Sequence, residues 1–301
     1  MRARQISPRE ATFERSLAVR DDLGGIGAYE RRAPLAHYCR SLPGEPALTS
    51  SKAFILHLDR AVARRPNVRA LVDSLPIESE VVAAVDGAQL SQEELDRVYV
   101  RRRFEPRYPF ALTRTEVGAF LSHRAAWRQI VDEALDFAFI FEDDAEIEPA
   151  PFAALLAFAT AERSAWDYVL MPAQPIRNGT ELARRGALAL LRPDQPPLRA
   201  IAQIVSLAAA RRLLDRTLPF DRPIDTFMQM AWVTGQPMLV ASPSPVRDVS
   251  LKSGGSTVQR QSMGFAERLR HEALRPIYRA QVLARYRRHL AEGTGQHAPG
   301  A

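Results

Sequence analysis

Three consecutive carboxylates, Glu142, Asp143 and Asp144, directly follow an apolar, aromatic-rich segment at residues 137–141. Apolar residues on both faces of a strand predict burial in a sheet that is covered on both sides. The three acids at the end of such a strand repel one another unless a cation offsets their charge. Mg²⁺ and Mn²⁺ take oxygen ligands and commonly share them with substrate phosphates. We therefore predict a divalent-metal site here, with a solvated acidic turn as the alternative.

The length and composition allow one large α/β domain or two smaller ones in the 301 residues. No apolar run approaches the roughly 20 residues that a membrane-spanning helix needs. The charged N-terminus lacks the apolar core of a signal peptide, so export is not expected. Cys39 is the single cysteine, so no internal disulfide forms and a reducing, cytoplasmic compartment is expected.

The formal net charge is +6, and Lys52 and Lys252 are the only lysines among the 41 basic residues. Arginine suits phosphate and carboxylate recognition. The charge fits nucleotide phosphates, anionic lipid headgroups or nucleic acid, and it does not choose among them.

Strand and helix patterns alternate after residue 52, which predicts a parallel α/β sheet. Thr113 and Glu116 form a capping box at the start of a helix over residues 113–135. The expected strands are 53–58, 80–85, 137–141, 168–171, 201–207 and 238–241. The other expected helices are 60–75, 149–163, 208–216, 224–232 and 265–290, the last broken at Pro276. We expect a poorly ordered extension at 1–51, a catalytic domain at 52–262, and a basic helical tail with a disordered end at 263–301.

Several segments resemble the family 25 glycosyltransferases, which extend bacterial lipopolysaccharide and lipooligosaccharide and include relatives that glycosylate collagen. The matching sequences are FILHLDR at 54–60, AVDG at 84–87, EVGAFLSH at 116–123, FIFEDDA at 139–145, PID at 223–225 and STV at 256–258. The family usually has Asn where His57 stands here.

The resemblance implies a GT-A-like nucleotide-sugar-binding fold with a mostly parallel central sheet flanked by helices, followed here by C-terminal basic helices. It also implies a hexosyltransferase, commonly inverting, with a UDP-sugar such as UDP-galactose as donor. The acceptor is expected to be a lipid-linked saccharide, a lipooligosaccharide or another surface glycan. Mn²⁺ or Mg²⁺ is the expected cofactor, and resemblance to transferases with an Asp-x-Asp element supports this.

Asp144 is the first candidate for direct metal contact. In an extended strand Glu142 and Asp144 point to one face and Asp143 to the other, so the other two acids are assigned to metal-bound water, ribose or sugar. Asp225 is the candidate general base, and its alternative is helix capping, for which Asp is well suited.

The remaining candidates are assigned to the nucleotide sugar. Asp59 and Asp86 follow strands, where α/β sheets place ligand contacts, with turn stabilisation as their alternative. The others are Arg60, Arg64, Ser122, His123 and Lys252. Ser122 and His123 alternatively lock a helix to the sheet, and Lys252 beside a Ser-Gly-Gly-Ser sequence is a candidate for a lid.

The basic tail suits either an anionic membrane surface at the inner face of the cytoplasmic membrane or packing on the domain. Two other functions compete with glycosyl transfer. A metal-dependent phosphoesterase lacks support, since no Asp-x-Asp-x-Thr motif or histidine cluster is present. A noncatalytic binder of nucleic acid or another anion is the third class, but no known nucleic-acid-binding motif is found, so nucleic acid is not an expected partner.

Overall fold

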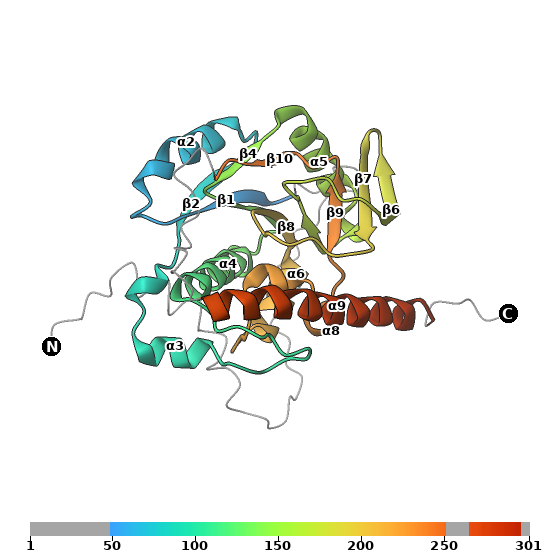
Figure 1. The fold of residues 1–301 in the computed structure, drawn as a ribbon. Coiled ribbons are helices and arrows are strands. Elements are labelled where there is room, and N and C mark those ends of the chain that lie inside the picture. Colours follow the sequence, from blue (N-terminus) through green and yellow to red (C-terminus); the bar gives the residue numbers. More distant parts are fainter. Residues whose placement is uncertain (1–48, 251–264, 296–301) are drawn as a thin grey trace, which may run out of the picture.

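The computed structural model describes residues 49–250 and 265–295. Its centre is an eight-stranded sheet with the order β2-β1-β3-β8-β5-β9-β7-β6, and β4 pairs with β10 in a separate two-stranded sheet (Figure 1). The strands are β1 Ser51–His57, β2 Ser79–Ala83, β3 Phe137–Glu142, β4 Ala145–Ile147, β5 Tyr168–Leu170, β6 Gly179–Arg185, β7 Leu188–Pro193, β8 Ala202–Ser206, β9 Leu239–Ser242 and β10 Val246–Asp248.

All strands of the large sheet run in one direction except β8 and β7. β1 lies between two parallel neighbours, with Ala53 opposite Ser79 on β2 and Phe139 on β3. The α/β class and the mostly parallel sheet flanked by helices are confirmed.

Helices cover both faces of the sheet: α2 and α5 on one, α4 and α6 on the other (Figure 1). The helices are α2 Arg65–Ser74, α3 Gln92–Val98, α4 Arg114–Asp132, α5 Pro149–Ala161, α6 Leu207–Arg216, α7 Ile224–Met228, α8 Ala231–Thr234 and α9 Phe265–Gly295. Short 3-10 turns are η2 Val62–Arg64, η3 Gly87–Gln89 and η4 Arg163–Ala165.

The aromatic strand β3 shows why both faces must be covered. Phe137, Phe139 and Phe141 pack toward α5, while Ala138 and Ile140 belong to the core on the α4 side. All five are fully buried. Burial of each phenylalanine contributes about 1.5–3 kcal/mol, so the strand that ends in three acids is anchored firmly.

The predicted capping box of α4 is present. Thr113 N donates to Glu116 Oε2 at 2.7 Å, and Glu116 N donates back to Thr113 Oγ1 at 3.2 Å. The same helix carries Ser122 and His123 toward the end of β3.

Two predictions about helices were wrong. The helix expected at 224–232 is divided into α7 and α8, because Met230 adopts a non-helical φ/ψ of −90° and 72°. The helix α9 continues through Pro276. A proline inside a helix costs about 3 kcal/mol, and the buried side chains of Tyr278, Val282 and Tyr286 offset this cost.

The strands β4, β6, β7 and β10 and the helix α3 were not predicted. β6 is almost wholly exposed at the edge of the sheet, so its sequence shows no alternation of apolar and polar residues. β4 and β10 have three residues each, too few for a periodic pattern. β4 pairs with the distant β10 and β7 with the distant β9, whereas β6 pairs only with its chain neighbour β7, and α3 begins at a capping box of Ser91 and Glu94 that was not recognised in the sequence.

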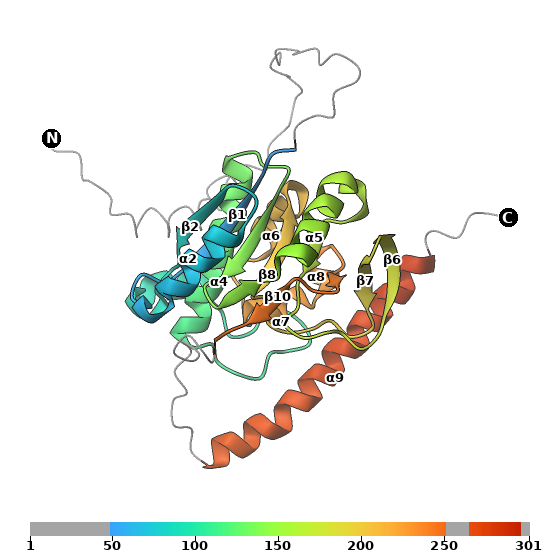
Figure 2. The ribbon, with the colours of Figure 1, turned by 90° about the horizontal axis from the view of Figure 1, so that it is seen from above.

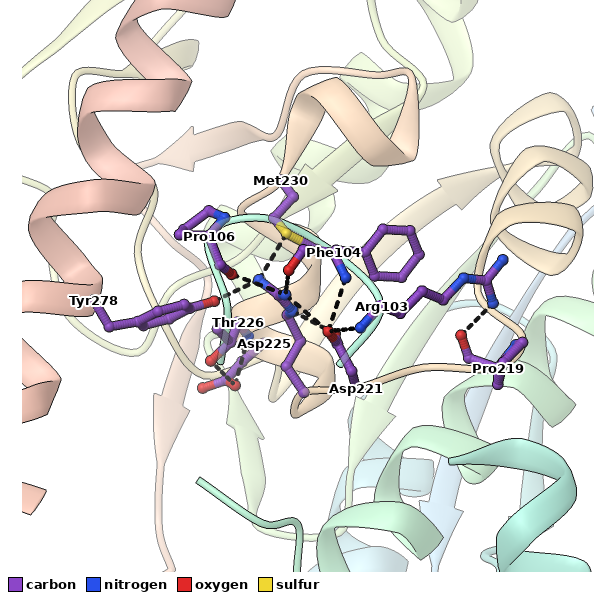
Figure 3. Close-up of polar contacts among 10 residues, drawn as sticks. Arg103, Phe104, Pro106, Pro219, Asp221, Asp225, Thr226, Met230 and Tyr278 are labelled. Atoms are coloured by element: carbon purple, nitrogen blue, oxygen red, sulfur yellow. Dashed lines mark hydrogen bonds and ion pairs between the residues drawn. The ribbon is translucent and has the colours of Figure 1, made fainter. Parts of the chain in front are cut away.

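The long helix α9 lies along one side of the domain, with its C-terminal end beside β6 and β7 (Figure 2). Tyr278 of α9 points toward the residues around Asp221 and Phe104 (Figure 3). There Arg222 Nη1 donates to Tyr278 Oη at 2.7 Å. Arg222 is fully buried, pairs with Asp221, and donates to the carbonyl oxygens of Phe104 and Pro106 at 2.9 and 3.1 Å. One guanidinium therefore joins α9, the start of α7 and the 104–106 loop.

Some predicted features lie outside the described residues. These are the extension at 1–48, Lys252 with its glycine-containing loop, and the segment 256–258. The proposed domain boundaries at 51 and 262 remain predictions.

Two glycines let η3 approach α4 beside the ends of β1 and β2. A Cβ on Gly118 would lie 2.5 Å from the carbonyl oxygen of Val85 and 2.6 Å from Gly87 N. Alanine in a helix interior normally adds about 1 kcal/mol relative to glycine. Gly118→Ala is instead expected to lower the free energy of unfolding by about 1–3 kcal/mol, the usual cost of overpacking, measured by urea unfolding.

The control is Gln129→Ala on the same helix, which is expected to change stability by less than about 0.5 kcal/mol. A Gly118→Ala protein as stable as the wild type would contradict this close packing.

Candidate functional site

A cleft of about 310 Å³ lies at the carboxyl ends of β1 and β3, where nucleotide-binding α/β sheets place their ligands. Predicted site residues from five separate segments line it. They are Arg60, Arg64, Asp86, Ser122, His123, Glu142, Asp143, Asp144 and Asp225. The sheet thus brings together most of the residues that the sequence singled out.

The charge of the acidic turn is partly offset by Arg64. This residue is 6% exposed and pairs with Asp143, while its Nη2 lies 3.3 Å from Asp144 Oδ2. Burial disfavours the charged guanidinium, but the hydrogen bond to Asp143 and the surrounding carboxylates raise the pKa of Arg64 overall. The protein therefore supplies part of the counter-charge from its own chain.

The alternation predicted for an extended strand does not hold for these acids, because Asp143 and Asp144 lie in the turn after β3 and the guanidinium of Arg64 contacts both. Asp143 Oδ2 accepts a hydrogen bond from His57 Nδ1 at 2.9 Å, and Asp143 Oδ1 is bound by Arg64. Asn67 Nδ2 donates to the carbonyl oxygens of Asp143 and Ala145, both at 2.9 Å. Since both oxygens of Asp143 are engaged, its side chain holds the turn in shape and is a poor candidate for a metal ligand.

A chain of hydrogen bonds orients Glu142. Gln203 Nε2 donates to His123 Nδ1 at 2.6 Å, which leaves the proton of the neutral ring on Nε2. His123 Nε2 then donates to Glu142 Oε1 at 3.2 Å. Gln203 and His123 are almost completely buried, whereas Glu142 is a third exposed. His123 therefore positions a carboxylate that faces the cleft.

Asp144 has an unusual environment. It is 6% exposed, and its Oδ1 is buried without a hydrogen-bond partner among the described residues. Burial, followed by the negative charge of Glu142, raises the pKa of Asp144 to about 7, against the opposing effect of Arg64. A buried carboxylate oxygen without a donor is stabilised by a cation or a proton.

Asp225 lies in the first turn of α7, but Pro223 and not Asp225 is the N-cap residue. Its carboxylate accepts hydrogen bonds from Thr226 N at 2.6 Å and from Arg199 N at 3.2 Å. Burial raises the pKa of Asp225, and these hydrogen bonds lower it in part. A half-buried carboxylate with a raised pKa suits a proton acceptor.

Arg199 holds Asp225 from a strained position. Its φ of 71° lies in the left-handed region, which costs a residue with a Cβ about 1–2 kcal/mol. Its side chain pairs with Asp248. Such strain is typical of functional sites.

Asp86 and Ser122 line the cleft but are engaged in local structure. Asp86 caps η3 through Ala88 N at 3.1 Å and pairs with Arg60 Nε at 2.8 Å. Ser122 Oγ accepts from Val85 N and donates to Gly118 O, which locks α4 to the loop after β2. The alternatives of turn stabilisation and of locking helix to sheet account for these contacts.

The assignment of Asp59 to the nucleotide is not supported. Asp59 is exposed and does not line the cleft, although its neighbours Leu58 and Arg60 do, and its backbone oxygen accepts from Arg65 Nη2 at 3.1 Å. Three residues that contribute to the site were missed: Asn67, Gln203 and Arg199. A glutamine inside the apolar segment 201–206 was a usable signal for Gln203, whereas Arg199 stands out through its backbone conformation alone.

The cleft offers few side-chain ligands to a divalent metal. No group of three or more His, Cys, Asp or Glu side chains is arranged to hold a metal ion in the described part of the chain. Asp144, with its unpartnered Oδ1, and the cleft-facing Glu142 remain as candidate ligands. Mg²⁺ is often held by one or two carboxylates with substrate phosphates completing its coordination, so these two residues suffice for such a site.

Comparisons with known proteins identify relatives of this chain. A family model described as glycosyltransferase family 25 (LPS biosynthesis protein) matches residues 50–176. A Drosophila melanogaster protein named glycosyltransferase 25 family member is 31% identical over 209 residues, which is 65% of this chain and 34% of that protein. Human procollagen galactosyltransferase 2 is 30% identical over 129 residues, 41% of this chain and 21% of that protein.

Other relatives are named as inactive. The human inactive glycosyltransferase 25 family member 3 is 28% identical over 201 residues, covering 64% of this chain and 33% of that protein. The chain spans about a third of the length of the relatives that it matches over some 200 residues. A solved glycosyltransferase involved in glycosylation of the major capsid of PBCV-1 matches with a TM-score of 0.33 and 9% identity, over 64% of this chain and 82% of that one.

The raised pKa of Asp144 predicts a stability effect with a definite sign. The unfolded chain releases the Asp144 proton at its ordinary pKa near 3.8, and the folded protein releases it at about 7. The wild type without metal therefore loses stability between pH 4 and pH 7. Asp144→Asn removes this loss and is expected to raise the free energy of unfolding at pH 8 by up to about 4 kcal/mol.

Urea unfolding in EDTA at pH 4.5, 6 and 8 measures the effect, with Asp73→Asn, an exposed aspartate outside the cleft, as control. A variant that is less stable than the wild type at every pH would show that Asp144 acts as a structural acceptor.

Proposed function

We propose that this chain is a glycosyltransferase of family 25, whose family model matches residues 50–176, and that it moves a hexose, of the galactose type, from a nucleotide sugar to a saccharide acceptor. The expected donor is a UDP-sugar, and the expected acceptor belongs to lipopolysaccharide or another surface glycan. The observation that supports this best is the cleft itself. It holds an acidic turn with an unpartnered carboxylate oxygen together with Asp225, whose pKa is raised.

The donor side is assigned to the acidic turn and its arginines. A divalent metal bound there would neutralise the charge that develops on the departing nucleoside diphosphate. Asp144 and Glu142 would hold it, and His123 keeps Glu142 in place. Arg60 is half exposed at the cleft and is available to phosphate oxygens, whereas Arg64 is committed to the acidic turn.

The acceptor side is assigned to Asp225. In one in-line displacement, the acceptor oxygen forms the bond to the anomeric carbon as the bond to the diphosphate breaks. Asp225 takes the proton of the acceptor hydroxyl, and the configuration at the anomeric carbon inverts. The raised pKa of Asp225 brings its basicity closer to neutral pH, where a general base is most effective.

Two competing readings are tested by the same measurements. Relatives named as inactive match with similar identity, so a noncatalytic member of the family is the second candidate. A phosphoesterase would use the same carboxylates to activate water, and it would release phosphate and not a transferred sugar.

Calorimetric titration with UDP, with and without Mn²⁺, tests the donor site. Mn²⁺ is expected to tighten UDP binding, because two carboxylates and the diphosphate complete its coordination. Asp144→Asn is expected to weaken the metal-dependent part by at least about tenfold, whereas Asp73→Asn should not. UDP binding with the same affinity in the presence and absence of Mn²⁺ would refute the metal assignment. A separate screen of sugar donors, measuring release of the nucleoside diphosphate, would identify the donor substrate.

Asp225→Asn separates catalysis from structure. Turnover is expected to fall by about 10²–10⁴-fold, the usual contribution of a general base, with UDP affinity unchanged. Asparagine keeps one acceptor oxygen, enough for Thr226 N or Arg199 N but not for both, because these donors bind different oxygens of Asp225; the thermal melting temperature is therefore expected to fall by no more than a few degrees. A lower melting temperature with nearly normal turnover would assign Asp225 to holding α7.

A further inference from the structure

A second cavity, of about 530 Å³, adjoins the first and has a strongly basic lining. It lies between the loop after β5, the loop before β8 and the helix α9. Arg199 lines both cavities, so they share a wall. We call the second cavity the α9 groove.

The basic charge of the α9 groove is not neutralised locally. Four arginines line it against one acid, Asp194. Arg199 is paired with Asp248, but Arg177, Arg279 and Arg287 form no side-chain hydrogen bond or ion pair with any described residue. All three are exposed. Three free guanidinium groups facing one cavity favour an anionic ligand.

The helix α9 presents its arginines in a fixed position. Tyr278, Val282 and Tyr286, spaced by four residues, are buried against the domain, and Tyr286 Oη donates to Pro193 O at 3.0 Å. Arg279 and Arg287 follow these tyrosines by one residue and are eight residues apart, about 12 Å along the helix axis. One phosphate or carboxylate cannot reach both, so the spacing favours an extended ligand.

The rest of the lining suits a sugar chain. Amide side chains from Gln174, Asn178, Gln195 and Gln229 can pair with hydroxyl groups, and four prolines form firm apolar walls. Gln229 is held in place by its hydrogen bond to Pro196 O at 2.7 Å. It lies four residues after Asp225, so the α7 segment places the candidate base in the cleft and Gln229 in the α9 groove.

We infer that the α9 groove binds the acceptor, and that the acceptor is an anionic saccharide carrying phosphate or carboxylate groups. This inference rests on the proposed function, because the bound saccharide would place its terminal hydroxyl beside Asp225, on the other side of Arg199. The guanidinium groups of Arg177, Arg279 and Arg287 bind the anionic groups, and the amides bind the hydroxyls.

Three trisaccharides test the inference: trigalacturonic acid, phosphorylated maltotriose and neutral maltotriose. They are titrated into the full chain in the presence of UDP and Mn²⁺, which are expected to occupy the donor cleft and so keep the probes from binding there. At least one anionic probe is expected to bind at least about tenfold more tightly than maltotriose, with affinity that falls as salt is added. The probe that is preferred identifies the anionic group.

Arg279→Gln combined with Arg287→Gln is expected to weaken the anionic probe by about tenfold. The control combines Arg211→Gln with Arg288→Gln, exposed arginines outside the α9 groove that give the same change of charge; it should bind like the wild type. UDP affinity should be equal in all three proteins. If the wild type binds the anionic probe but not UDP, the proposed donor site is refuted, whereas the inference about the α9 groove is not.

Equal binding of neutral and anionic probes, no binding of any probe, or an equal loss in the control would overturn the inference. So would a loss seen only in binding to phosphatidylglycerol vesicles, because α9 would then contact a membrane and not a saccharide.

Discussion

The ion pair between Arg64 and the acidic turn is the interaction on which the site depends. Three carboxylates at the end of a buried strand would repel one another, and the guanidinium removes part of that repulsion from inside the fold. With His57 it engages both oxygens of Asp143, so the acids differ in role although they are adjacent in sequence. The family usually has asparagine at position 57, and here the histidine supplies the hydrogen bond to Asp143. Glu142 and Asp144 are left facing the cleft.

The unpartnered oxygen of Asp144 destabilises the folded protein when no ligand is bound, and it is available to a cation that binds in the cleft. A carboxylate buried beside another acid destabilises the folded state at neutral pH, and a bound cation would relieve this. The backbone of Arg199 is also unfavourable in energy but useful to the site. Its φ lies in the left-handed region, and from this conformation its N–H donates a hydrogen bond to Asp225. Both features concentrate unfavourable energy in the cleft, while the aromatic core beneath β3 provides the stability that tolerates it.

The buried Arg222 connects this cleft with the C-terminal helix. It lies within the segment that leads into α7 and bonds to Tyr278 of α9, so the position of α9 is coupled to the helix that carries Asp225 (Figure 3). In the part of the chain that the structure describes, no helix is long and apolar enough to span a bilayer. Two of the basic residues of α9, Arg279 and Arg287, line the α9 groove.

The sequence by itself determined the elements whose evidence is local: the buried aromatic strand with its acids, the capping box of α4, the alternation of strands and helices, and the motifs that resemble family 25 glycosyltransferases. The candidate residues on those elements were found for the same reason. The order of the sheet and the antiparallel direction of β7 and β8 depend on pairing between distant segments, and the exposed edge strand β6 shows no apolar periodicity although it pairs with its chain neighbour β7. Likewise, only the tertiary structure decided that Arg64 is the partner of the acids, that Gln203 orients His123, and that Arg199 separates two cavities. Each of these contacts joins residues far apart in the chain, so chain folding and not residue type determines which charges meet.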